Sequence, residues 1–325
     1  MRKALIVGID YYENGNSLNG SANDAKKVMH ILSNHADDSR NFHTMDFFVT
    51  EKSNAIDCGN LKEMIVDLFN GQNEIALFYF SGHGSFNKTE GGQILTSETK
   101  RGDDGVLLSF IMKAANNSPA RNKILILDSC FSGSLGDSTN FSGLCELKEG
   151  VTILTACTAQ EAAYEDDGVG LFTDLLVDAL NGGAASILGD ITPGSIYAHI
   201  DQSLGPWNQR PVFKTNVQNF VSLRKATPAI RLSDLKKLNE LFPSRGYKYQ
   251  LDPSFEPNEN GKPEGAAKAN PENNAVFAIL QKYNRLNLLV PDDATHMWDA
   301  AMESKTCSLT PLGEHYRKIV IKELL

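Results

Sequence analysis

Short apolar runs recur along the first half of the chain, and each is closed by polar residues or glycine. They are rich in Ile, Leu, Val and Phe, and they are apolar throughout rather than alternating with polar positions. Unbroken apolarity over this length is typical of strands buried on both faces of a parallel sheet. We therefore predict strands over 3–10, 45–50, 74–84, 123–130 and 151–157.

Stretches with helical spacing separate these runs. In 23–35, the residues Ala25, Val28, Met29 and Leu32 fall on one helical face. Helices are predicted over 23–35, 60–70, 106–117 and 170–181. Strands that alternate with helices indicate an α/β fold: a doubly wound, mostly parallel sheet with helices on both faces. Sites in such folds form at the carboxyl ends of the strands.

Composition divides the chain near residue 228. We expect one large domain over 1–228 and a small, mainly α domain over 229–325. Within the small domain, 252–274 is rich in proline and poor in apolar residues, which predicts a linker or mobile loop. Helical patterns follow over 275–289 and 295–324. The small domain is expected to recruit a protein partner or to regulate the large one.

Charge and cysteine usage limit the function classes. The 325 residues carry a net charge of −9, which argues against a nucleic-acid partner. The opening "MRKALIVGID" starts like a signal peptide, but its apolar run stops at Asp10 and is too short for a signal or a membrane anchor. We expect a cytoplasmic protein without a membrane partner. The five cysteines form no CxxC motif and no zinc spacing, which argues against disulfides and structural zinc.

A histidine and a cysteine follow two of the predicted strands. His83 lies between glycines at the end of 74–84, and Cys130 ends the run "KILILDSC". An imidazole beside a cysteine supplies or stabilises the reactive thiolate. The backbone amides of Gly84 and Cys130 can hold a developing oxyanion. The alternative is a core cysteine and a turn histidine, which the two matched strand ends and their glycines disfavour.

The motifs around these two residues resemble those of the caspase-like cysteine peptidases, particularly the metacaspase and bacterial orthocaspase branch. The similar segments are, in order, "ALIVGIDYY", "LNGSANDA", "FYFSGHG", "LDSCFSG", "TACTAQEAAYED" and "GLFT". The resemblance implies that Cys130 attacks a peptide carbonyl and that His83 protonates the leaving amine. It implies an oxyanion hole at the amides of Gly84 and Cys130. The family requires no third carboxylate, and the chemistry requires no cofactor.

Two positions depart from the usual metacaspase motifs. Phe131 stands where those proteins have histidine, and Ser21 stands where many have cysteine. Neither change affects the nucleophile or the base. The departures favour a bacterial relative over the eukaryotic metacaspases.

The resemblance also suggests which bonds are cut. Asp24, Ser81 and Asp128 match the S1 pocket of members specific for Arg or Lys. An acidic pocket favours a cationic P1 side chain, best an arginine held by two hydrogen bonds. The substrate is then a protein or peptide with a basic P1 residue. Asp24 also suits the first turn of a helix, where an acid interacts with the helix dipole, and the two roles are compatible.

Acidic loops suggest a calcium site, because several metacaspases bind Ca²⁺ beside the cleft. The long polar stretches 84–105 and 131–150 follow the two site strands and are expected to wall the cleft. They contain the four candidate ligands Glu98, Asp103, Asp104 and Asp137. A solvated acidic loop is the alternative.

Self-cleavage is expected at Lys148, with Lys100 and Arg101 as further candidates.

Three functions remain open at this point. The favoured one is a thiol protease that cleaves after Arg or Lys, as a regulated effector in bacterial defence or cell death. The "CSLTPLGEHYRKIV" segment resembles the end of winged-helix modules in bacterial defence proteins, which supports recruitment by a sensor. The second is a catalytically silent caspase-fold scaffold. The third is another hydrolase or a nucleotide-binding protein, for which "YYENGNSLNG" offers no GxGxxG and no Walker lysine.

Overall fold

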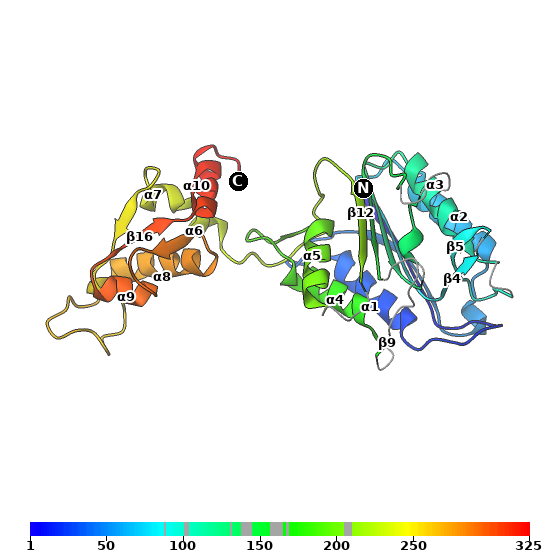
Figure 1. The fold of residues 1–325 in the computed structure, drawn as a ribbon, viewed down its shortest axis with the longest axis horizontal. Helices are drawn as coiled ribbons and strands as arrows, with labels where there is room; N and C mark the ends of the chain where they lie inside the picture. Colours follow the sequence, from blue (N-terminus) through cyan, green and yellow to red (C-terminus); the bar gives the residue numbers. More distant parts are fainter. Residues whose placement is uncertain are drawn as a thin grey trace. The chain divides into compact units, whose positions relative to one another are not determined.

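A mostly parallel six-stranded sheet forms the centre of the amino-terminal part of the protein (Figure 1). The computed structural model describes residues 1–87, 89–100, 104–130, 132–137, 145–156, 165–166, 169–204 and 210–325. The order of the strands is β12-β8-β7-β3-β1-β2, and only β12 runs antiparallel to its neighbour. Their bounds are β1 Arg2–Ile9, β2 His43–Val49, β3 Ile75–Ser81, β7 Asn122–Asp128, β8 Val151–Thr155 and β12 Val212–Asn216.

Helices cover both faces of this sheet. On one face, α2 (Cys58–Phe69) and α3 (Leu108–Asn117) pack on one hydrophobic cluster. On the other, α1 (Ser21–Ser33), α4 (Leu171–Asp178) and α5 (Pro193–Ser203) pack on a second cluster. All residues of β3 are buried, as unbroken apolarity predicts for a strand covered on both sides. The predicted doubly wound α/β architecture is confirmed.

Several elements were not predicted from the sequence. The stretch 84–105 was expected to be loop. It contains β4 (Gly84–Asn87) and β5 (Gly91–Ile94), which form a small antiparallel sheet with β6 (Val106–Leu107). Edge strand β12 and helix α5 were also missed. The other small strands, helical turns and the π-helical turn are β9 Glu165–Asp166, β10 Val169–Gly170, β11 Asp190–Ile191, β13 Arg224–Lys225, η1 Lys52–Asn54, η2 Ser132–Ser134 and η3 Ala179–Gly183.

The chain divides into two compact units, Met1–Thr227 and Pro228–Leu325. The second unit combines short helices with a three-stranded antiparallel sheet of order β14-β16-β15. Its elements are α6 Leu232–Lys236, α7 Leu238–Leu241, β14 Lys248–Gln250, η4 Pro253–Phe255, α8 Pro271–Arg285, β15 Leu289–Pro291, α9 Met297–Met302, β16 Thr306–Leu309 and α10 Pro311–Ile321. Across the described ranges, every helix is too short or too polar to cross a membrane.

The helix predicted over 295–324 is wrong in its middle. The chain leaves α9 through Ser304, which has a positive φ of 53°, and then enters β16. A residue with positive φ interrupts a right-handed helix. Cys307 is fully buried in the strand while its neighbours Thr306 and Ser308 are half-buried, as expected where successive side chains point to opposite faces of a sheet. The mainly α description of this unit therefore omits its sheet.

The boundaries predicted for a mobile loop over 252–274 are wrong at both ends. At the start, Phe255 is buried and makes an edge contact with Phe277 at a ring distance of 6.2 Å. At the end, Asn270 caps α8 by accepting hydrogen bonds from the amides of Glu272 and Asn273. The apolar contact and the helix cap fix these ends, so only the residues between Phe255 and Asn270 lack regular structure.

Candidate functional site

The register of β3 and β7 determines where the site forms. Ser81, the last residue of β3, lies opposite Asp128, the last residue of β7. One residue further, the Gly82 amide donates a hydrogen bond of 3.2 Å to the carbonyl oxygen of Asp128. His83 and Cys130 each follow two residues after this pair, at the same carboxyl edge of the sheet. The structure thus brings together the two residues that the sequence analysis paired.

The backbone of Gly84 lies directly against that of Cys130. A Cβ atom on Gly84 would be 2.1 Å from the carbonyl oxygen of Cys130, so no other residue fits without moving the chain. The Leu95 amide donates to the His83 carbonyl at 2.9 Å, which makes Gly84 and Ile94 a non-hydrogen-bonded pair of the β4–β5 ladder. The Gly84 amide therefore points away from β5, as a donor of an oxyanion hole must.

The His83 ring is held by the loop after β1. Its Nε2 atom lies 2.7 Å from the carbonyl oxygen of Asn16. Because a carbonyl oxygen only accepts, Nε2 carries the proton and Nδ1 is the nitrogen left to exchange a proton with a thiol. The Tyr12 ring packs against the imidazole at 4.6 Å, and the Tyr12 hydroxyl accepts a 2.7 Å hydrogen bond from the backbone amide of His83.

Asn16 and Tyr12 were not predicted from the sequence, although both lie in the "YYENGNSLNG" segment that was considered for nucleotide binding. This segment is anchored where it meets α1, because the Asp10 carboxylate accepts a 3.1 Å hydrogen bond from the Ala22 amide. Burial raises the pKa of Asp10, and the bonds from the helix amides act against that rise. At Gly8, a Cβ would be 2.4 Å from the Ser21 carbonyl, so glycine permits the close packing of β1 on α1.

The three residues predicted to form the S1 pocket are all buried. Asp24, Ser81 and Asp128 have exposed fractions of 2%, 3% and 8%. They gather around the fully buried Tyr79 hydroxyl: burial raises the pKa of Tyr79, and the charges of Asp128 and Asp24 raise it further. Ser81 hydrogen-bonds to the same hydroxyl. Two carboxylates thus lie beside the strand ends that carry His83 and Cys130.

Helices α1 and α4 hold these carboxylates. The Thr173 hydroxyl of α4 donates a 2.7 Å hydrogen bond to Asp128 Oδ2. Lys27 of α1 bridges Asp24, at 3.3 Å, and Asp174 of α4, at 2.8 Å. Partial burial lowers the pKa of Lys27, but Asp174 and Asp24 raise it overall, so the ammonium stays charged. Thr173 and Lys27 were not predicted from the sequence, because the Thr173–Asp128 and Lys27–Asp174 contacts join elements far apart in the chain.

Lys214 of edge strand β12 organises the turn after Cys130. Its ammonium donates to the carbonyl oxygens of Gly133, at 2.8 Å, and Leu135, at 2.9 Å, and forms a 2.6 Å ion pair with Asp137. Asp137, a predicted calcium ligand, is therefore already matched with a cation.

The other candidate residues of the two loops are Glu98, Asp103, Asp104, Lys148, Lys100 and Arg101. Glu98 and Asp104 are exposed, and Asp103 lies outside the described residues. Within the described ranges no group of three or more His, Cys, Asp or Glu side chains is arranged to hold a metal. Lys148 is exposed, and its amide donates a 2.9 Å hydrogen bond to the Asn116 side chain. Lys100 is also exposed, and Arg101 is outside the described part.

The described cysteines, Cys58, Cys130, Cys145 and Cys307, form no disulfide with one another, and Cys157 lies outside the described ranges. Cys130 is half-buried. Cys307 is fully buried in the second unit, and burial raises its pKa to about 12, which makes it unreactive.

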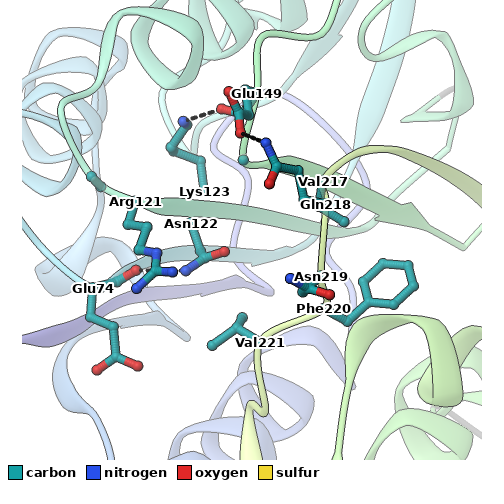
Figure 2. A pocket seen from close by; sticks show the side chains of 12 residues that line it. Glu74, Arg121, Asn122, Lys123, Glu149, Val217, Gln218, Asn219, Phe220 and Val221 are labelled. Atoms are coloured by element: carbon teal, nitrogen blue, oxygen red, sulfur yellow. Dashed lines mark hydrogen bonds between the residues drawn. The ribbon is translucent and has the colours of Figure 1, made fainter.

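A cavity of about 460 Å³ opens at the opposite end of the same sheet (Figure 2). It is lined by residues that precede β3 or begin β7, such as Glu74, Arg121 and Lys123. The Lys123 ammonium donates a 2.7 Å hydrogen bond to the Glu149 carbonyl, and burial lowers the pKa of Lys123. Because the strands run in parallel, this cavity is separated by the full length of β7 from Cys130 and is not part of the candidate site.

Comparisons with known proteins agree with this geometry. The family model described as the caspase domain matches residues 1–239, and the chain belongs to that family. A caspase domain indicates a cysteine peptidase that acts on proteins or peptides. The central sheet and the helices on its two faces are accordingly those of a caspase fold.

Two solved structures are similar to the chain. Protein GSU0716 from Geobacter sulfurreducens is 15% identical, with a TM-score of 0.51, over 70% of this chain and 98% of its own. Caspase-1 from Spodoptera frugiperda is 11% identical, with a TM-score of 0.49, over 70% of this chain and 91% of its own. At 15% identity, the similarity to GSU0716 shows a shared fold alone. No curated protein matches the chain.

Proposed function

We propose that the protein is a cysteine endopeptidase that hydrolyses peptide bonds after Arg or Lys. The observation that carries this proposal is the burial of two carboxylates, Asp24 and Asp128, beside the strand ends that bear His83 and Cys130. Lys27 lies 3.3 Å from Asp24, and two buried carboxylates in one region make a site that favours cations. Such an acidic site suits the guanidinium or ammonium group of a basic P1 side chain.

The chemistry follows from the roles of four groups. The Cys130 thiolate attacks the carbonyl carbon of the basic P1 residue, and the amides of Gly84 and Cys130 donate to the resulting oxyanion. The tetrahedral adduct collapses to a thioester as His83 gives a proton from Nδ1 to the departing amine. A water molecule then attacks the thioester and gives its proton to His83. The acyl–sulfur bond breaks, which releases the carboxylic acid and restores the Cys130 thiolate beside a protonated His83.

The proposal also covers the branch of the caspase family and the biological role of the protein. We place the chain with the metacaspases and bacterial orthocaspases, because the acids Asp24 and Asp128 are suited to basic rather than acidic P1 residues. We assign it to a regulated role in bacterial defence or cell death. The separate unit Pro228–Leu325 supports regulation, since a second compact unit can bind a sensor or partner.

A panel of fluorogenic peptides that differ only at P1 tests the function. The purified full chain is expected to release the fluorophore from Arg and Lys substrates much faster than from Asp or Ala substrates, and Cys130→Ala should release none. A peptide reagent with an acyloxymethyl ketone after Arg should label Cys130. A chain that neither cleaves nor is labelled would instead be a catalytically silent scaffold.

A further inference from the structure

A buried chain of hydroxyl groups ends on the Asp128 carboxylate. Thr173 and Tyr79 are both fully buried, on α4 and β3 respectively. Thr173 Oγ1 lies 2.7 Å from Asp128 Oδ2, and Tyr79 Oη lies 2.6 Å from Thr173 Oγ1. Ser81 in turn hydrogen-bonds to the Tyr79 hydroxyl. Four polar side chains from three elements thus form one continuous path.

Each hydroxyl group has a single proton to donate, and this determines the direction of every hydrogen bond in the chain. A threonine hydroxyl has one proton, and the Thr173 proton is donated to Asp128. Tyr79 must therefore donate to Thr173, and Ser81 must donate to Tyr79. Burial and the nearby acids raise the pKa of Tyr79, so the phenol keeps the proton that it donates. Every donor in the chain points toward Asp128, which favours the ionised form of that carboxylate.

Asp174, the residue after Thr173 in α4, is linked to Asp24 through Lys27. Asp174 forms a 2.8 Å ion pair with Lys27, and the same ammonium lies 3.3 Å from Asp24. Thr173 therefore contacts the Asp128 carboxylate directly, and the next residue, Asp174, contacts the Lys27 ammonium that lies beside Asp24. The placement of α4 on the sheet is coupled to the geometry of the whole acidic pocket.

We propose that Thr173, supported by Tyr79, is a positioning residue for substrate specificity: it fixes the Asp128 carboxylate as an anion aimed at the basic P1 side chain. This inference rests on the proposed cleavage after Arg or Lys and names the part of the protein that sets that preference. Thr173 itself touches neither the substrate nor Cys130, so its effect passes through Asp128.

The removal of a single hydroxyl isolates this effect. Thr173→Val keeps the β-branched shape of the side chain and removes the donor to Asp128. The kcat/KM for an Arg substrate is expected to fall about tenfold or more, mostly through KM, since a hydrogen bond to a charged group is lost. The kcat/KM for a substrate with an uncharged P1 residue should change far less. Thr173→Ser restores the hydroxyl and should return most of the Arg preference.

Thr152→Val is the matched control. Thr152 is also buried, and its hydroxyl lies 2.8 Å from that of Thr215 near the start of β8, at the far end of the sheet. This variant should keep the Arg preference of the parent protein. Tyr79→Phe provides a second test, because it removes the next donor without changing the ring. A smaller loss in the same direction is expected, and concentrations of active enzyme are set by labelling Cys130.

The outcomes separate this inference from the proposed function. If the parent protein shows no preference for Arg or Lys at P1, the proposed specificity fails and this inference falls with it. If the parent prefers Arg and Thr173→Val lowers Arg and uncharged substrates equally, Thr173 is structural only and the inference is overturned. Unaltered selectivity in both Thr173→Val and Tyr79→Phe overturns it as well.

Discussion

Ser81 and Asp128 are paired across the adjacent parallel strands β3 and β7. This one register brings both proposed pocket residues to the carboxyl edge of the sheet, and it does the same for His83 and Cys130 two residues later. Any shift of β7 along β3 would separate both pairs together. The proposed catalytic and specificity groups therefore depend on the same backbone hydrogen bonds.

Replacement of either central residue should remove the peptidase activity. Cys130→Ala is expected to lower kcat/KM on an Arg substrate by a factor on the order of 10⁴ or more, and His83→Ala by several orders of magnitude, because nucleophile and base act as a unit. Both variants should keep the thermal unfolding midpoint of the parent protein. Cys145→Ala, which changes an exposed cysteine, serves as the control and should remain active. A Cys130→Ala protein that still cleaves peptides would disprove the mechanism.

Neutralising Asp128 should change specificity more than rate. Asp128→Asn keeps the shape of the side chain and removes one of two pocket charges. The kcat/KM for an Arg substrate is expected to fall about 30-fold or more relative to that for an uncharged one. Asp37→Asn removes an exposed charge, one that accepts a hydrogen bond from the Ser39 amide, and should leave the ratio unchanged. An equal loss on both substrates would indicate damage to the fold instead.

The Tyr12 hydroxyl should matter for the rate. Tyr12→Phe keeps the ring that packs on His83 but leaves the His83 amide without the acceptor seen at 2.7 Å. A lost acceptor for a buried donor lets the His83 backbone move, and kcat is expected to fall about tenfold. Steady-state kinetics of Tyr12→Phe and of the neighbouring control Tyr11→Phe measure this. The same kcat in all three proteins would show that the amide needs no fixed partner.

The central sheet was predictable, and the proposed catalytic pair could be placed at its edge, because both have strong local signals. Unbroken apolar runs identified the core strands. Two of their ends were marked by His83, which lies between glycines, and by Cys130, which is followed by Gly133 three residues later. Strand β12 was missed because none of its five residues is buried, so its hydrophobic pattern is faint. Lys214, which holds the turn after Cys130, was missed with it.

The supporting groups of the site could not be identified from local sequence. Asn16 acts through a backbone carbonyl, and any residue type has one. Thr173 acts through a single hydroxyl that meets Asp128 only after β3, β7 and α4 have packed. Such contacts depend on tertiary structure rather than on spacing along the chain. The sequence therefore identified the groups proposed to react, and the structure was needed to identify those that hold them.

Self-cleavage is expected at Lys148. This residue is exposed and lies between Cys130 and β8, in a loop whose cut would leave the sheet intact. Intact-mass spectrometry of the incubated parent protein should show two fragments that meet after Lys148, while Cys130→Ala should remain whole. Lys148→Gln should remove this cut, and Lys148→Arg should keep it. Cuts after Lys100 or Arg101 in place of Lys148 would move the site to the loop after His83, and no fragments at all would exclude self-processing.

Calcium binding at Asp137 would require an exchange of cations. The Asp137 carboxylate already pairs with Lys214 at 2.6 Å, so Ca²⁺ would have to displace that ammonium. A hard cation that prefers six to eight oxygen ligands needs further donors, and the proposed ones are Glu98, Asp103 and Asp104. We expect such weak binding to raise activity only at millimolar Ca²⁺, and chelation to return it to the basal level.

Lys214→Met tests this competition directly. Without the ammonium, Asp137 is open to calcium, so the activity should respond at a lower Ca²⁺ concentration even if the basal rate falls. Asp137→Ala should abolish the response, and Glu146→Ala, a change at an exposed acid outside the proposed ligand set, should leave it intact. Titration calorimetry of the three variants and the parent protein provides a readout independent of activity. Unchanged activity under chelation, together with no heat of Ca²⁺ binding, would show that Lys214 is the only cation that Asp137 holds.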